Sequence, residues 1–138
     1  MTPEQHLENF YRENRERAVE YFYNRLCDAK LKSYTDAPRE PTLVAVGVAF
    51  DNLIAGLVNR TPEAYVEAQT ALFKKRIAAG VAPKDLLGGL KSAEETMAWL
   101  IEEASAARPD FGPQLKRMGQ QYLLMTHMTA ISIRSYQP

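Results

Sequence analysis

The segment from Ala71 to Leu100 constrains the fold most strongly, because it contains a complete helix–turn–helix: ALFKKRIAAGVAPKDLLGGLKSAEETMAWL. Apolar residues recur at helical spacing on both sides of the turn. Gly80 is placed to end the first helix in the left-handed conformation, and Pro83 with Asp85 is placed to begin the second. No segment elsewhere alternates as a strand does, so the sequence predicts an all-α fold.

Helical periodicity and end signals predict five helices, over about residues 2–32, 42–57, 62–79, 83–104 and 113–136. Thr2 is a candidate N-cap, with Pro3 in the first helical position and Gln5 where a capping box requires it. The polar residues Asn14 and Arg15 interrupt the first apolar stripe, which leaves a bend or break near Asn14 open.

The starts of the second and third helices are also marked. The stretch 33–41 is proline-rich and almost free of apolar residues, so we expect a loop there and a helix from Thr42. Val44 and Val48 lie off the main stripe of this helix, which suggests burial on two sides, as in a central helix. Thr61 is expected to cap the third helix.

The last predicted helix has two apolar stripes. One repeats at alternating spacings of three and four, as a coiled-coil seam does, and the other comprises Leu124, Met128 and Ile131. Two stripes imply two partners, one within the domain and one on a second subunit. The sequence therefore predicts a homodimer, and its candidate interface residues are Trp99, Met118, Tyr122, Met125, Thr129 and Tyr136.

Composition limits the class of protein. The chain has 138 residues, 46% of them hydrophobic and 25% charged, which suits one globular domain over residues 1–138. Lys+Arg and Asp+Glu number 17 each, so no net field attracts nucleic acid. Cys27 is the single cysteine, and no uninterrupted apolar run approaches the roughly 20 residues of a membrane span. Without a signal-peptide pattern either, we expect a cytoplasmic protein.

Two histidines, His6 and His127, are available for metal, haem or phosphotransfer chemistry, and both are expected to be partly exposed or at an interface. One alternative is a haem- or bilin-binding sensor with His127 as the haem ligand. Another is a phosphotransfer module using His127, although Met128 follows it where such sites commonly carry an acid. No di-iron, nucleotide-binding or hydrolase motif occurs, so we expect no metal site, no cofactor and no enzymatic activity.

Three residues are candidates for binding a small ligand, namely Arg76, Met97 and Trp99. The simplest role of Arg76 is to complement the C-terminal end of the helix dipole, and the alternative is that it turns inward to bind an anion. The small residues between Gly88 and Trp99 suit either close packing within one subunit or a dimer contact anchored by Trp99. Met97 suits the core or a soft apolar pocket.

The order Arg76, Gly80-Val81-Ala82-Pro83, Leu86-Leu87 and Trp99 resembles the N-terminal input domain of the sigma-B co-antagonist proteins, the RsbR/RsbRD family that builds stressosomes. The resemblance implies a five-helix, globin-like, non-haem bundle that dimerises and continues from its long last helix into a C-terminal STAS domain. It also implies signal transduction, with stressosome-type regulators as partners. We therefore expect a regulatory input domain that relays a ligand or partner event through its last helix.

Overall fold

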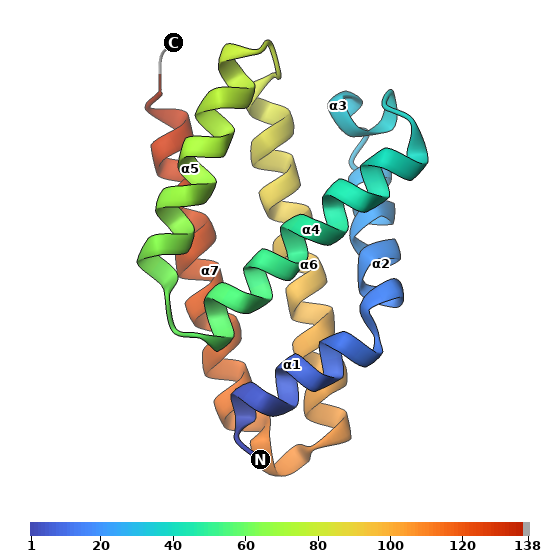
Figure 1. The fold of residues 1–138 in the computed structure, drawn as a ribbon, viewed down its shortest axis with the longest axis vertical. Helices are drawn as coiled ribbons and strands as arrows, with labels where there is room; N and C mark the ends of the chain where they lie inside the picture. The colour runs from blue at the N-terminus through green and yellow to red at the C-terminus, as the bar shows by residue number, and fades with distance from the viewer. Residues whose placement is uncertain (137–138) are drawn as a thin grey trace.

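The computed structural model describes residues 1–136, so the last two residues of the predicted 1–138 domain lie outside the described range. The described residues form α1 (Pro3–Glu13), α2 (Arg15–Asp28), α3 (Lys32–Thr35), α4 (Arg39–Val58), α5 (Pro62–Ala78), α6 (Pro83–Ala107), the 3-10 turn η1 (Pro109–Phe111) and α7 (Gly112–Arg134). The all-α prediction is confirmed. Helices α5, α6 and α7 run along the long axis of the molecule, and α1 and α4 cross them obliquely (Figure 1).

The first predicted helix is two helices, α1 and α2, which meet at an angle at Asn14 (Figure 1). The Asn14 backbone leaves the helical region at φ −116° and ψ 18°, and its side-chain amide donates to the Phe10 carbonyl at 2.9 Å. The Tyr11 hydroxyl and the Arg15 guanidinium both donate to Asp51 of α4, at 2.6 and 2.8 Å. This polar cluster holds both sides of the break against α4.

The predicted loop 33–41 is only partly a loop. It contains most of the short helix α3, and α4 begins at Arg39 rather than at Thr42. Pro38 precedes α4 with an extended backbone, and Pro41 lies within its first turn. A proline is tolerated there because the first backbone N–H groups of a helix have no intrahelical acceptor.

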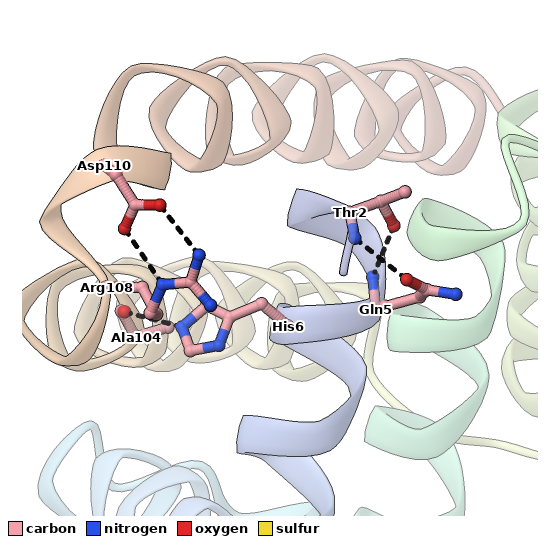
Figure 2. Close-up of polar contacts among 6 residues, drawn as sticks. All are labelled: Thr2, Gln5, His6, Ala104, Arg108 and Asp110. Carbon is pink, nitrogen blue, oxygen red and sulfur yellow. Dashed lines mark hydrogen bonds and ion pairs between the residues drawn. The ribbon is translucent and has the colours of Figure 1, made fainter.

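Of the two predicted threonine caps, the structure contains the one at Thr2 and not the one at Thr61. At α1 the capping box is complete: the Thr2 amide donates to Gln5 Oε1 at 2.8 Å, and the Gln5 amide donates to Thr2 Oγ1 at 3.1 Å (Figure 2). Thr61 precedes α5 without a side-chain capping bond, so that prediction is wrong. Pro62 still begins the helix, because its fixed φ suits the first helical position.

Gly80 ends α5 as predicted. Its φ of +101° lies in the region that only glycine adopts without strain. The Gly80 amide donates to the Ile77 carbonyl at 2.9 Å, and the Val81 amide donates to the Arg76 carbonyl at 3.0 Å. These two bonds form a Schellman motif, which reverses the chain into α6.

The main core lies where α6 and α7 meet α1, α2 and α4. Its largest fully buried side chains include Leu7, Leu26, Phe50, Leu57, Met97, Leu100, Leu115, Tyr122 and Met125. A smaller cluster joins α5 to α6 and α7, around Phe73, Leu86, Leu90, Ala130 and Ile133. Both clusters draw on α6 and α7, so these two helices hold the bundle together.

Helix α4 is apolar on more than its buried face. Val44 and Val48 are 66% and 52% exposed, so the expectation that they are buried on a second side is wrong. Contrary to the sequence analysis, α4 is also long and apolar enough to cross a membrane, with a mean hydropathy of 1.7. Phe50 and Leu53 on its inner face belong to the core. One such helix is weak evidence for a span and is compatible with a soluble protein.

The two stripes of α7 have different surroundings. Met118, Tyr122, Met125 and Thr129 are buried within the single chain, at most 8% exposed, so the structure places these four candidate dimer residues in its own interior. The other stripe is open to solvent, with Leu124 and Ile131 61% and 64% exposed. Helical periodicity identifies two apolar faces on α7 but does not say which of them its own domain covers.

Candidate functional site

A cavity of about 280 Å³ lies between α2, α3, α4, α5, α6 and α7. A protein cavity of about 150 Å³ holds a benzene molecule, so this space suits a body about twice that size. The residues around it are Phe22, Leu26, Ser33, Tyr34, Ala37, Pro38, Pro41, Thr42, Ala45, Val46, Ala49, Leu53, Tyr65, Gln69, Leu72, Phe73, Arg76, Gly89, Leu90, Ala93 and Tyr122. Most of these are apolar, as is usual for a small-molecule site.

Short side chains on two helices account for the space. Ala45 and Ala49 line the cavity from α4, and Gly89 and Ala93 line it from α6. None of these side chains extends beyond Cβ, so they leave the interior between the two helices open. Phe73 from α5 and further aromatic residues line it, which gives the cavity an apolar wall, and exposed residues such as Pro41 and Leu72 border its opening to solvent.

The short helix α3 forms one wall of the cavity because two glycines let it approach α6. A Cβ atom at Gly88 would lie 2.6 Å from Leu31 Cδ2, and one at Gly89 would lie 2.8 Å from the Tyr34 hydroxyl oxygen. Any larger residue would force these side chains to move. At Gly88 and Gly89, the small-residue face of α6 therefore receives the α3 segment of its own chain.

Asp85 links α3 to the start of α6 through two hydrogen bonds. Its Oδ2 accepts hydrogen bonds from the Ser33 hydroxyl at 2.5 Å and from the Ser33 amide at 3.0 Å. The Ser33 hydroxyl bond is the main cause that lowers the pKa of the Asp85 carboxyl below its ordinary value of 3.8. Asp85 thus does more than begin a helix, since its ionised form positions the cavity wall.

We predict that Asp85→Asn lowers the free energy of unfolding at neutral pH by about 1 kcal/mol, the usual contribution of a hydrogen bond. The folded pKa of Asp85 is below the unfolded value, so this contribution is complete above about pH 5 and is lost as pH falls through the folded pKa. Urea unfolding at several pH values measures it. Asp36→Asn, at an exposed residue beside α3, is the matched control. A wild-type advantage that persists in strong acid would contradict the assignment.

Arg76 is the candidate ligand residue that lies on the cavity. Seven of the ten arginines in the sequence pair with carboxylates within 4.0 Å: Arg12, Arg15, Arg17, Arg25, Arg39, Arg60 and Arg108. Among residues 1–136, Arg76, Arg117 and Arg134 have no such pair. Arg117 and Arg134 are exposed, whereas Arg76 is half-buried against the cavity.

Three tyrosines bring hydroxyl groups to the same cavity. Burial raises the pKa of Tyr34, an effect that the nearby Arg76 guanidinium partly opposes. Burial also raises the pKa of Tyr65 and Tyr122, so all three hydroxyls are protonated at neutral pH and can donate. Tyr122 is 0% exposed, and its hydroxyl has no hydrogen-bond partner among the described residues. Such a buried unpaired group costs about 1–3 kcal/mol.

The other two ligand candidates lie elsewhere. Met97 is 1% exposed and belongs to the main core. Trp99 stacks on Tyr21 with 5.0 Å between ring centroids, and the Arg17 guanidinium carbon lies 5.3 Å from the Trp99 ring centroid. These contacts join α6 to α2 within one chain. At the end of α7, Tyr136 lies under Lys74 of α5, with Nζ 5.4 Å from the ring centroid.

His6 is buried, which corrects the expectation that it is partly exposed or at an interface. Its Nε2 lies 2.9 Å from the Ala104 carbonyl oxygen of α6, next to the Arg108–Asp110 ion pair (Figure 2). The rings of Phe10 and Phe111 enclose it, with centroids 6.0 and 5.8 Å away. His6 therefore links α1 to the C-terminal end of α6.

His127 is exposed on α7, with Nε2 3.9 Å from Glu94 Oε1. The Glu94 carboxylate also accepts the hydroxyl hydrogen bond of Thr126. Neither His6 nor His127 lines the cavity, so no histidine is positioned to ligate haem there. Among residues 1–136, no cluster of three His, Cys, Asp or Glu side chains is arranged to hold a metal ion.

Comparison with family models, curated proteins and solved structures finds no match to this chain. The function is therefore inferred from the residues and their geometry. Sequence reasoning identified Arg76 but missed Tyr34 and Tyr65 as cavity residues, and it assigned Tyr122 to a dimer interface. The Gly88-Gly89 pair was a visible signal of close approach, but the sequence does not say which segment approaches.

Proposed function

We propose that this chain is a non-enzymatic regulatory input domain of a cytoplasmic protein, which binds a small ligand in the cavity and transmits occupancy through α7. One observation carries the proposal: α7 faces both the cavity and the solvent. Tyr122 lines the cavity, while Leu124 and Ile131 on the same helix are exposed. A ligand that repositions Tyr122 moves the exposed stripe with it, because packed helices shift between discrete arrangements.

The exposed stripe of α7, comprising Leu124, Met128 and Ile131, is the surface that we propose for homodimerisation. A shallow groove lies on each side of the helix: Ile101 and Leu123 border the one against α6, and Met128 borders the one against α5. A ridge with neighbouring grooves suits packing against the same helix of a second copy about a two-fold axis. This arrangement replaces the buried residues that the sequence analysis assigned to the interface.

The proposed output is a STAS domain of the stressosome type, reached through the end of α7. Its support is the resemblance of the Arg76–Trp99 segment to the sigma-B co-antagonist input domains. A haem sensor with His127 as ligand, or a phosphotransfer module using that residue, receives no comparable support. His127 is exposed outside the cavity, and its nearest acid, Glu94, is engaged by Thr126.

Sedimentation equilibrium tests the dimer and its coupling to the cavity. We expect the wild-type chain to dimerise in the micromolar range, and a strict monomer at high micromolar concentration would contradict the proposal. Ala49→Phe places a ring in the cavity and is expected to change the dimer dissociation constant about fivefold or more. Val48→Phe adds the same ring at an exposed neighbouring position and should leave the constant unchanged. Equal constants for the two variants would contradict coupling.

A further inference from the structure

Arg76 is the one charged residue among the described residues that line the cavity. No carboxylate of residues 1–136 lies within ion-pair distance of it. We propose that the ligand is an amphipathic monocarboxylate, whose carboxylate binds the Arg76 guanidinium and whose apolar body fills the cavity toward Tyr122. This inference rests on the proposed function, because it names the chemistry of the ligand that the input domain binds.

The charge of the site fits a single anion. The fork of guanidinium N–H donors matches a carboxylate, and a pair of charge-assisted bonds is stronger where an apolar wall excludes water. Lys74 and Lys75 precede Arg76 in α5, but Lys74 lies over the Tyr136 ring and Lys75 is exposed. Neither lysine lines the cavity, so Arg76 is the cation that a bound ligand meets.

The described groups around Arg76 leave its charge without a carboxylate partner. The Arg76 guanidinium lowers the pKa of the Tyr34 hydroxyl through its charge and through a side-chain hydrogen bond, but burial keeps that hydroxyl protonated. A hydroxyl that accepts from Arg76 can still donate its own proton to an anion. Asp85 is the acidic group that also acts on Tyr34, but its carboxylate accepts both hydrogen bonds from Ser33 and it does not line the cavity. The Arg76 end of the cavity therefore offers donors to a ligand carboxylate.

The cavity extends away from this end along α5. Arg76 and Tyr65 both line it and lie about three turns apart, which is about 16 Å at 1.5 Å per residue. A volume of about 280 Å³ spread over this length is narrow, so it favours an extended apolar body. At the far end, Tyr122 lies close enough to Tyr65 for the two hydroxyls to influence each other, and its unpaired hydroxyl is a donor without formal charge. The two ends thus differ in charge, and this difference orients the ligand.

Isothermal titration calorimetry with three matched probes tests the assignment: octanoate, 1-octanol and octylammonium. They share one apolar chain and differ in the charge of the head. We expect octanoate to bind the wild-type chain about tenfold or more tightly than 1-octanol, and octylammonium to bind most weakly. Arg76→Met should reduce the affinity for octanoate to that for 1-octanol, while Arg76→Lys restores part of the difference.

Two control variants locate the carboxylate. Lys75→Met removes a neighbouring charge outside the cavity, and Tyr122→Phe removes the far hydroxyl while keeping the ring. Both should retain the preference for octanoate. Loss of the preference in Tyr122→Phe but not in Arg76→Met would overturn the orientation. Ala49→Phe should abolish binding of all three probes, and binding that survives this change would show that the probes occupy another site.

The outcomes separate this inference from the proposed function. If the wild-type chain binds all three probes equally, the carboxylate assignment is wrong, but a ligand-binding input domain remains supported. If it binds none of them, the ligand class is also wrong. The proposed function is then still tested by sedimentation, which measures whether Ala49→Phe in the cavity changes the dimer dissociation constant. A chain that binds octanoate selectively but never dimerises would support the ligand class and contradict the proposed transmission of ligand occupancy through α7 to a dimer.

Discussion

Replacing Phe50 by alanine is expected to lower the free energy of unfolding by about 3–5 kcal/mol, the largest effect of a single substitution that we predict. Phe50 is 0% exposed at the centre of α4. Its ring centroid lies 5.4 Å from that of Tyr11 in α1 and 5.8 Å from that of Phe22 in α2. Truncation removes the contacts that join three helices and leaves a cavity that the surrounding side chains fill only partly.

Urea unfolding followed by circular dichroism measures this effect. Val48→Ala is the matched control, because Val48 lies on the exposed side of the same helix and its truncation should change stability by less than about 0.5 kcal/mol. If Phe50→Ala prevents folding altogether, Phe50→Leu gives a smaller loss that can still be measured. A loss at Phe50 no larger than that at Val48 would contradict the packing of α4 against α1 and α2.

The second large effect concerns association. The double variant Leu124→Glu/Ile131→Glu is expected to raise the dimer dissociation constant by about a hundredfold or more, since each dimer would have to bury four carboxylates in an apolar contact. Both residues are exposed in the single chain, at 61% and 64%. The free energy of unfolding of the monomer should therefore change little. Sedimentation velocity measures the association, and thermal unfolding checks the fold.

A control variant with the same change in charge makes this result specific. Asn24→Glu/Asn52→Glu adds two carboxylates at exposed positions of α2 and α4, outside the proposed interface. It should leave the dimer unchanged. A dimer that survives the change on α7 but dissociates in the control would place the interface over α2 and α4 instead.

Local signals at the helix ends were predictable because each depends on residues only a few positions apart. Thr2 and Gln5 complete their capping box, and Gly80 takes the positive φ that ends α5. The break at Asn14 was visible as an interruption of the apolar stripe. Its cause was not, because Asp51, which holds Tyr11 and Arg15, is distant in the sequence.

The candidate site was predictable at one residue. A cation near a helix end has a simple local explanation, and the sequence offered an anion site at Arg76 only as the alternative. Tyr122 was assigned to an interface because its apolar stripe resembles a coiled-coil seam. Trp99 is predicted to be an interface anchor, and the structure shows that it is partly buried and packs on Tyr21 and Arg17 of its own chain. In each case the pattern identified an apolar or charged surface without identifying its neighbour.

The sequence by itself determined that the chain is helical and where most helices begin and end, because capping and backbone conformation are short-range properties. Only the tertiary structure decided which stripe of α7 is buried, that His6 is interior, and that α3 lies against Gly88 and Gly89. It also decided that a cavity exists. The volume of a cavity depends on the distance between the helices that carry its short side chains. The packing of the whole bundle sets that distance.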